Sequence, residues 1–106
     1  MLNHGSAAGV FGALGDATRR SIISQLADGP ATVSELAIPL NISRSAVLQH
    51  LQVLEDSRLI RSHKSGRIRT CELDLAGLQA ASDWLDWHQR RWARRLDRLG
   101  ELLDND

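Results

Sequence analysis

The side chains best suited to recognition chemistry lie on one face of a predicted helix over residues 44–56. At 3.6 residues per turn, Val47, Leu51 and Leu54 form the inner apolar face, and the outer face carries no acidic residue before Glu55. The outer face and its leading end present Ser43, Arg44, Ser45, Leu48, Gln49 and Gln52. Arginine can donate two hydrogen bonds to guanine, glutamine can pair with adenine, and leucine can contact a thymine methyl group. This pattern predicts a helix that contacts base edges of double-stranded DNA.

Leu48 is the one large apolar residue that the helical period places on the outer face. Contact with a thymine methyl group would explain its position. A single exposed leucine is also common on protein surfaces and needs no functional explanation. The sequence leaves both interpretations of Leu48 open.

Positive charge is concentrated around this helix, although the whole sequence is neutral with 13 basic and 13 acidic residues. Residues 43–70 hold six basic and two acidic side chains, which is a local excess of four positive charges. A phosphate backbone responds to the local patch rather than to the total charge. The neutral total therefore does not exclude a nucleic-acid partner.

Capping and turn signals predict the elements that position this helix. Residues of N-cap type precede four predicted helices, at Asp16, Thr32, Ser43 and Asp74. After Leu59 the apolar period changes from 3.6 to 2 around Ser65 and Gly66, which predicts a β-hairpin. The expected fold is one domain over residues 1–106, mainly α with a small hairpin, in the order ααααββα. Its helices are expected over residues 5–14, 17–27, 33–40, 44–56 and 75 to about 103.

The short helix over residues 33–40, the tight connector and the capped helix over residues 44–56 form a helix-turn-helix pattern. In such a unit the first helix and the turn brace the second helix. The N-terminal part of that second helix can then enter a DNA major groove about 12 Å wide.

This arrangement resembles the winged helix-turn-helix regulators of the ArsR (arsenic-repressor-like) family. The resemblance is carried by ALGDATRRSIISQLADGPATVSELA, ISRSAVLQHLQVLE, RLIRSHKSGRIRTCELD and the long last helix, which together cover nearly the whole chain. It implies operator binding as a homodimer, usually with repression relieved by a ligand. It also implies that the first and last helices, about 5–14 and 75–103, form the dimer interface. The base-contacting positions of the family fall on Arg44, Ser45, Leu48 and Gln49.

The resemblance places the family's wing on residues 61–70. Its cationic residues, expected near flanking phosphates or the minor groove, are His63, Lys64, Arg67 and Arg69. The alternative is a solvated hairpin tip with no ligand. A charge cluster beside a recognition helix is the electrostatic footprint of a DNA-binding protein, so we favour the DNA role.

The resemblance does not extend to the family's metal sites, and we expect no metal or other cofactor. Thr32 and Ser34 occupy positions where metal-binding members carry cysteines, and neither supplies a thiolate. The last helix offers His88 without the second histidine of the family's other metal site, so we interpret His88 as a packed residue. Cys71 is the only cysteine, which excludes a disulfide within one chain and favours a buried apolar role.

The last helix carries all three tryptophans, Trp84, Trp87 and Trp92. So much aromatic surface on one helix needs a partner, either the rest of the domain or a second subunit. We expect a two-fold homodimer, with a ligand pocket between the tryptophans as the less favoured alternative. Its predicted interface comprises Val10, Phe11, Leu14, Leu85, His88, Trp92, Leu96, Leu99 and Leu103.

These patterns favour a homodimeric transcription repressor that binds a pseudo-palindromic operator through helix 44–56 and wing 61–70. The alternative is a winged-helix protein-interaction module that uses the tryptophan-bearing helix without DNA. An enzyme is not expected, because no motif pairs a nucleophile with a base and no glycine loop binds phosphate. The lone cysteine, the lack of an apolar run of about 18 residues and the non-basic N-terminus predict a cytoplasmic protein. An unidentified small-molecule effector is compatible with the sequence.

Overall fold

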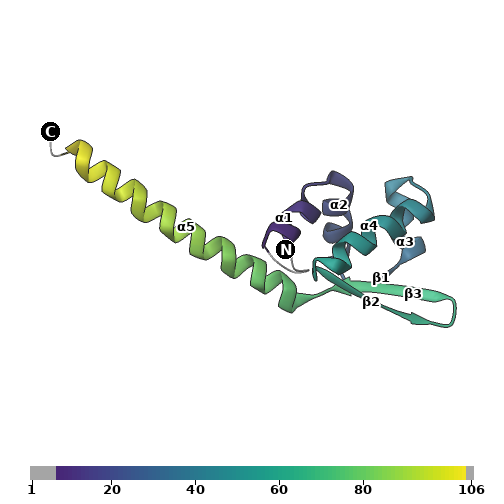
Figure 1. Ribbon diagram of the computed structural model, residues 1–106. Coiled ribbons are helices and arrows are strands. Elements are labelled where there is room, and N and C mark those ends of the chain that lie inside the picture. Colours follow the sequence, from purple (N-terminus) through teal and green to yellow (C-terminus); the bar gives the residue numbers. More distant parts are fainter. Residues whose placement is uncertain (1–6, 105–106) are drawn as a thin grey trace.

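A computed structural model describes residues 7–104 and confirms the mainly helical fold with a small sheet (Figure 1). Its elements are α1 (Ala7–Leu14), α2 (Ala17–Leu26), β1 (Ala31–Thr32), α3 (Val33–Leu40), α4 (Arg44–Asp56), β2 (Ile60–Ser65), β3 (Ile68–Leu73) and α5 (Leu75–Asp104). Among the described residues, the predicted helix ends agree with these bounds to within one residue. Residues 5 and 6 of the first predicted helix lie outside the described range.

The predicted caps hold the helix starts in place. The Asp16 carboxylate accepts a hydrogen bond from the Arg19 amide at 3.0 Å. The Thr32 hydroxyl accepts from the Glu35 amide at 3.1 Å, and Glu35 accepts from the Thr32 amide at 2.9 Å, which completes the capping box. Such side-chain acceptors satisfy amides that have no partner inside the helix.

The sheet has three antiparallel strands in the order β1-β3-β2. The hairpin register runs from the Ile60–Leu73 pair to the Ser65–Ile68 pair. Gly66 follows β2 with a φ of 61°, which glycine adopts without strain. The expected order ααααββα lacked β1. Its two residues pair with Thr70 and Cys71 of β3, and so short a strand leaves no periodic pattern in the sequence.

The core lies between the first four helices and the sheet. It contains Val10, Ala13, Ile22, Leu26, Val33, Leu36, Val47, Leu51, Leu54, Leu59, Ile60 and Cys71. Val10 was expected at the dimer interface, but only 3% of its surface is exposed because it packs inside its own protomer. We therefore withdraw Val10 from the predicted interface.

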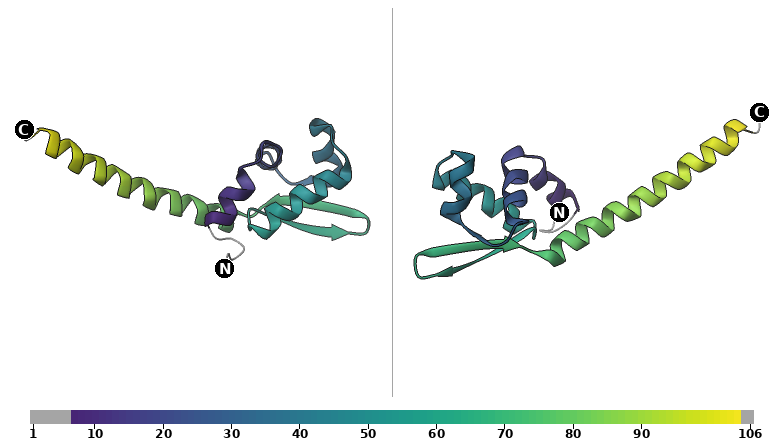
Figure 2. Two further views of the ribbon diagram at one scale, coloured as in Figure 1. Left: turned by 45° about the horizontal axis from the view of Figure 1, so that its top comes forward. Right: turned by 180° about the vertical axis from the view of Figure 1, so that it is seen from behind.

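Helix α5 extends away from this core, in the direction opposite to the β2–β3 hairpin (Figures 1 and 2). None of its described residues is buried, and the protomer measures 68 × 27 × 26 Å. Within residues 7–104, no helix combines the length and apolarity needed to cross a membrane.

Candidate nucleic-acid interface

Helix α4 is fixed by its cap and its buried face. The Ser43 hydroxyl accepts from the Ala46 amide at 3.1 Å, and Val47, Leu51 and Leu54 are fully buried. On the opposite side Ser45, Gln49 and Gln52 are exposed, as the helical period predicts. Gln52 already donates a hydrogen bond to the Asp56 carboxylate at 2.8 Å, so its amide is partly engaged within the helix.

Leu48 does not point fully outward. It is half-buried and packs against the edge of the core. The helical period places Leu48 outside, but contact with the core covers part of its side chain. The part of Leu48 that stays accessible borders the exposed polar face.

A second anchor of α4 runs through Arg19, which sequence reasoning missed. The Arg19 guanidinium donates to the carbonyl oxygens of Ala13 and Gly12 at 2.6 and 3.3 Å. It also lies 3.3 Å from His50 Nδ1, and His50 lies 3.8 Å from the Asp16 carboxylate. The hydrogen bond from the Arg19 amide lowers the pKa of Asp16. Arg19 therefore joins the ends of α1 and α2 to the middle of α4, and no local pattern signals a contact over 31 residues.

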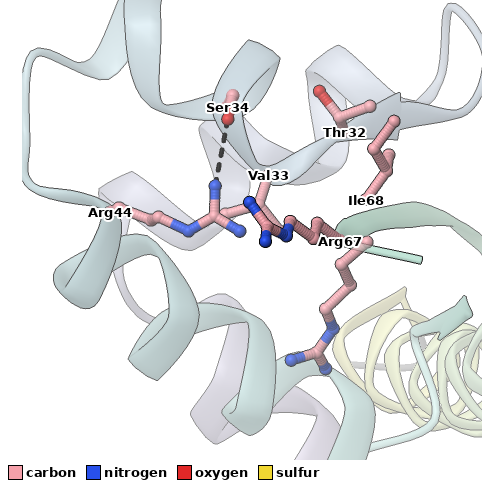
Figure 3. A pocket seen from close by; sticks show the side chains of 7 residues that line it. Thr32, Val33, Ser34, Arg44, Arg67 and Ile68 are labelled. Atoms are coloured by element: carbon pink, nitrogen blue, oxygen red, sulfur yellow. Dashed lines mark hydrogen bonds between the residues drawn. The ribbon is translucent and has the colours of Figure 1, made fainter. Parts of the chain in front are cut away.

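Arg44, at the start of α4, turns toward α3. Its guanidinium donates a hydrogen bond to the Ser34 hydroxyl at 3.0 Å (Figure 3). Both side chains line a cavity of about 260 Å³ that also borders the wing. The structure thus brings Arg44 together with Arg67 and Arg69, which the sequence placed only in a neighbouring element.

The wing is attached to α4 by a polar network. Arg69 donates two hydrogen bonds to the Glu55 carboxylate at 2.8 and 2.9 Å and one to the Ser62 hydroxyl at 3.0 Å. The Ser62 hydroxyl also hydrogen-bonds to Glu55. In this arrangement the Arg69 charge is satisfied inside the protein, so the predicted phosphate contact from Arg69 would compete with Glu55.

The remaining wing cations differ in their freedom. Arg61 pairs with Glu72 across the hairpin at 2.9 Å. His63, Lys64 and Arg67 are exposed, and within residues 7–104 none of the three forms an ion pair. These three side chains keep their capacity for an anionic partner.

The first turns of α5 pack on α1, whereas most of its apolar stripe is open. Phe11 of α1 contacts Trp84 with ring centroids 5.0 Å apart, and half-buried His88 lies between Trp84 and Trp87. The exposed stripe residues Leu85, Trp92, Leu96, Leu99 and Leu103 keep 49–66% of their surface accessible. The interface role expected of these residues stays a prediction.

The surroundings of Cys71 and Glu35 favour structural roles for both side chains. Burial raises the pKa of the Cys71 thiol, which disfavours the reactive thiolate. Backbone and side-chain hydrogen bonds with Thr32 lower the pKa of Glu35, in keeping with its capping role. Residues 7–104 contain no group of three or more histidine, cysteine or acidic side chains arranged to hold a metal ion.

Comparisons with known proteins agree with this geometry. The family described as "Bacterial regulatory protein, arsR family" matches residues 16–62, which run from the α2 cap into β2. The HTH-type transcriptional regulator Rv2034 of Mycobacterium tuberculosis is 45% identical over 94 residues, covering 89% of this chain and 85% of that protein. The transcriptional repressor SdpR of Bacillus subtilis is 33% identical over 76 residues, covering 72% and 84%. The structure of an ArsR-like transcriptional regulator from Rhodococcus sp. RHA1 superposes with a TM-score of 0.79 at 33% identity, over 91% of each chain.

Proposed function

Because this chain belongs to the ArsR family of bacterial regulatory proteins and is a DNA-binding transcription regulator, we propose that it acts as a homodimeric repressor on a pseudo-palindromic operator. The family consists of regulators rather than enzymes, and the chain is not an enzyme. A module that binds only proteins is not supported, because the relatives are named transcriptional regulators. We place its action in the cytoplasm.

One observation carries the proposal. The acid-free outer face of the first three turns of α4 begins with Arg44, which shares a cavity with Arg67 of the wing. Arg44, Arg67 and the wing residue Lys64 are exposed cations that no carboxylate neutralises within residues 7–104. A polar helix face next to uncompensated positive charge supports contacts to bases and phosphates together.

We assign the contacts by position. Ser45, Leu48 and Gln49 meet base edges in the major groove, with Ser43 and Gln52 at the two ends of the contact. The wing residues His63, Lys64 and Arg67 meet phosphates, and Arg69 holds the wing against α4 through Glu55. In a two-fold dimer the two α4 helices would lie about 34 Å apart and face half-sites one helical turn apart.

Selection from a random duplex library with the purified protein tests the proposal, followed by binding of the enriched duplex across a salt series. We expect an inverted repeat with half-sites one turn apart. Gln49→Ala should lower the ratio of affinities for the enriched and a scrambled duplex about tenfold, since a bidentate base contact is lost. Lys64→Ala should weaken both duplexes equally. Weak binding without an enriched sequence would contradict the operator, and equal effects of both variants on the ratio would contradict the division of roles.

A further inference from the structure

Three arginines and no acidic residue line one cavity at the junction of α3, α4 and the wing. Its lining residues are Thr32, Val33, Ser34, Arg44, Arg67, Ile68 and Arg69. Glu55 neutralises Arg69 from the core side. Arg44 and Arg67 make no ion pair within residues 7–104, so two full positive charges remain at this cavity.

The two charges converge rather than diverge. The Arg44 guanidinium is held by the hydrogen bond from its Nη1 to Ser34, and the Arg67 side chain extends toward it from the hairpin turn (Figure 3). Two like charges in one cavity repel each other unless an anion lies between them. Guanidinium groups bind phosphate oxygens through paired, charge-assisted hydrogen bonds, which suits them to this task.

The third wall of the cavity favours an anion as well. It is formed by the first turn of α3, where Val33 and Ser34 follow the Thr32 cap. The positive end of the helix dipole lies at this turn. The Ser34 hydroxyl, which accepts from Arg44, keeps its proton available for a further acceptor.

We propose that this cavity, the Arg44–Arg67 pocket, binds one phosphodiester group of the DNA backbone in each half-site. Arg44 and Arg67 are its ligands, and Ser34 is a positioning residue that holds Arg44 toward the phosphate. Arg44 therefore fixes the register of α4 on the backbone and does not contact guanine, in contrast to the role its place on the helix indicates. The inference rests on the proposed function, because the phosphate belongs to the DNA that α4 contacts.

The first test separates phosphate contacts from base contacts. Affinities of Arg44→Ala and Arg67→Ala are measured by fluorescence anisotropy on the enriched duplex and a scrambled duplex at several salt concentrations. Each variant should weaken both duplexes by the same factor, about tenfold, and reduce the slope of log affinity against log salt by about 0.9. Arg98→Ala, an exposed arginine of α5, is the control and should change neither quantity. A fall in the ratio of the two affinities for Arg44→Ala would overturn the assignment.

The second test locates the phosphate. The enriched duplex is made with single methylphosphonate substitutions, each of which removes one backbone charge and no base. The wild-type protein should lose affinity most at one phosphate per half-site, and Arg67→Ala should be insensitive at that position. Ser34→Ala should weaken binding less than Arg44→Ala does. The double variant Ser34→Ala with Arg44→Ala should bind no more weakly than Arg44→Ala alone. Ser34→Thr, which keeps the hydroxyl group, should bind like the wild type. Equal sensitivity of wild type and Arg67→Ala at every phosphate would refute the pocket.

A free anion is the other source of the same chemistry. Inorganic phosphate added at constant ionic strength should leave the melting temperature of the free protein unchanged. A rise for wild type that is absent in Arg67→Ala, together with no loss of affinity at any methylphosphonate position, would assign the pocket to a free anion and overturn the DNA assignment. If no duplex binds with salt dependence at all, the proposed function fails. If a specific duplex binds and these variants alter neither slope nor methylphosphonate pattern, only the pocket fails.

Discussion

At the scale of single residues, Glu55 binds Arg69 and so reduces the availability of this wing arginine to an external anion. Its carboxylate receives two hydrogen bonds from Arg69 and one from Ser62, so it ties the last turn of α4 to both strands of the hairpin. Arg69 and Glu55 expose only 28% and 20% of their side chains, which limits screening by solvent. The pair therefore joins the last turn of α4 to the wing, the two elements that would contact groove and backbone in the proposed complex.

We expect Glu55→Gln to lower the free energy of unfolding by about 1–3 kcal/mol, because a half-buried guanidinium loses its charged acceptor. The same change should strengthen binding to a scrambled duplex, since a negative charge near the DNA is removed and Arg69 is released. Urea unfolding and anisotropy titration measure the two effects.

Asp56→Asn provides the matched control, because Asp56 lies next in α4, is exposed, and its carboxylate accepts a hydrogen bond from the Gln52 side chain at 2.8 Å. It should change the free energy of unfolding by a few tenths of a kcal/mol. The double variant Glu55→Gln with Arg69→Gln should cost less than the sum of the single changes. Additive costs would show that the two residues act independently.

At the scale of elements, one glycine fixes where α5 leaves the domain. Gly77 donates its amide to the Asp74 cap at 3.2 Å. A Cβ atom built on Gly77 would lie 1.6 Å from the carbonyl oxygen of Arg58, in the corner between α4 and β2. Arg58 adopts a φ of 60°, and its amide donates a hydrogen bond to the Glu55 carbonyl oxygen at 2.9 Å. The start of α5 therefore packs directly against the backbone of this corner.

We expect Gly77→Ala to destabilise the protein and to displace the first turn of α5. An alanine in a helix is ordinarily about 1 kcal/mol more favourable than glycine, so a loss of stability would report the close approach alone. Gly100→Ala on the same helix meets open space and should stabilise the protein by up to about 1 kcal/mol. Urea unfolding of both variants makes the comparison, and a stabilising Gly77→Ala would show that the corner can relax.

The sequence predicted those elements whose ends are fixed by contacts between neighbouring residues. The caps at Asp16, Thr32 and Ser43 each bond within three residues, so their elements could be predicted. The pairing of β1 with β3 and the contact of Arg19 with His50 join residues more than 30 positions apart. No periodicity carries such information. The candidate interface was predicted as a face of α4, but the turn of Arg44 toward Ser34 depends on where α3 packs.

At the scale of the whole molecule, the protomer exposes an apolar surface along α5. Its radius of gyration is 18.2 Å, against about 13 Å for a compact domain of 100 residues, because α5 extends beyond the core. Leu85, Trp92, Leu96, Leu99 and Leu103 recur every three, four or seven residues along it. Such spacing forms one apolar stripe on a helix, and a second copy of α5 would cover it.

We expect the protein in solution to have twice the 11.7 kDa mass of the protomer, measured by light scattering after gel filtration. Leu96→Glu and Leu99→Glu should shift this mass toward the protomer, because a charge would be buried without a partner in the dimer. Both leucines are more than half exposed in the protomer, so the core should remain folded and the far-ultraviolet circular dichroism should change little. Ala80→Glu adds the same charge away from the stripe and should leave the dimer intact.

Separated protomers should lose affinity for a two-half-site duplex but not for a single half-site, since only the linkage between the two α4 helices is broken. A dimer that persists in both leucine variants would place the interface elsewhere on α1 and α5.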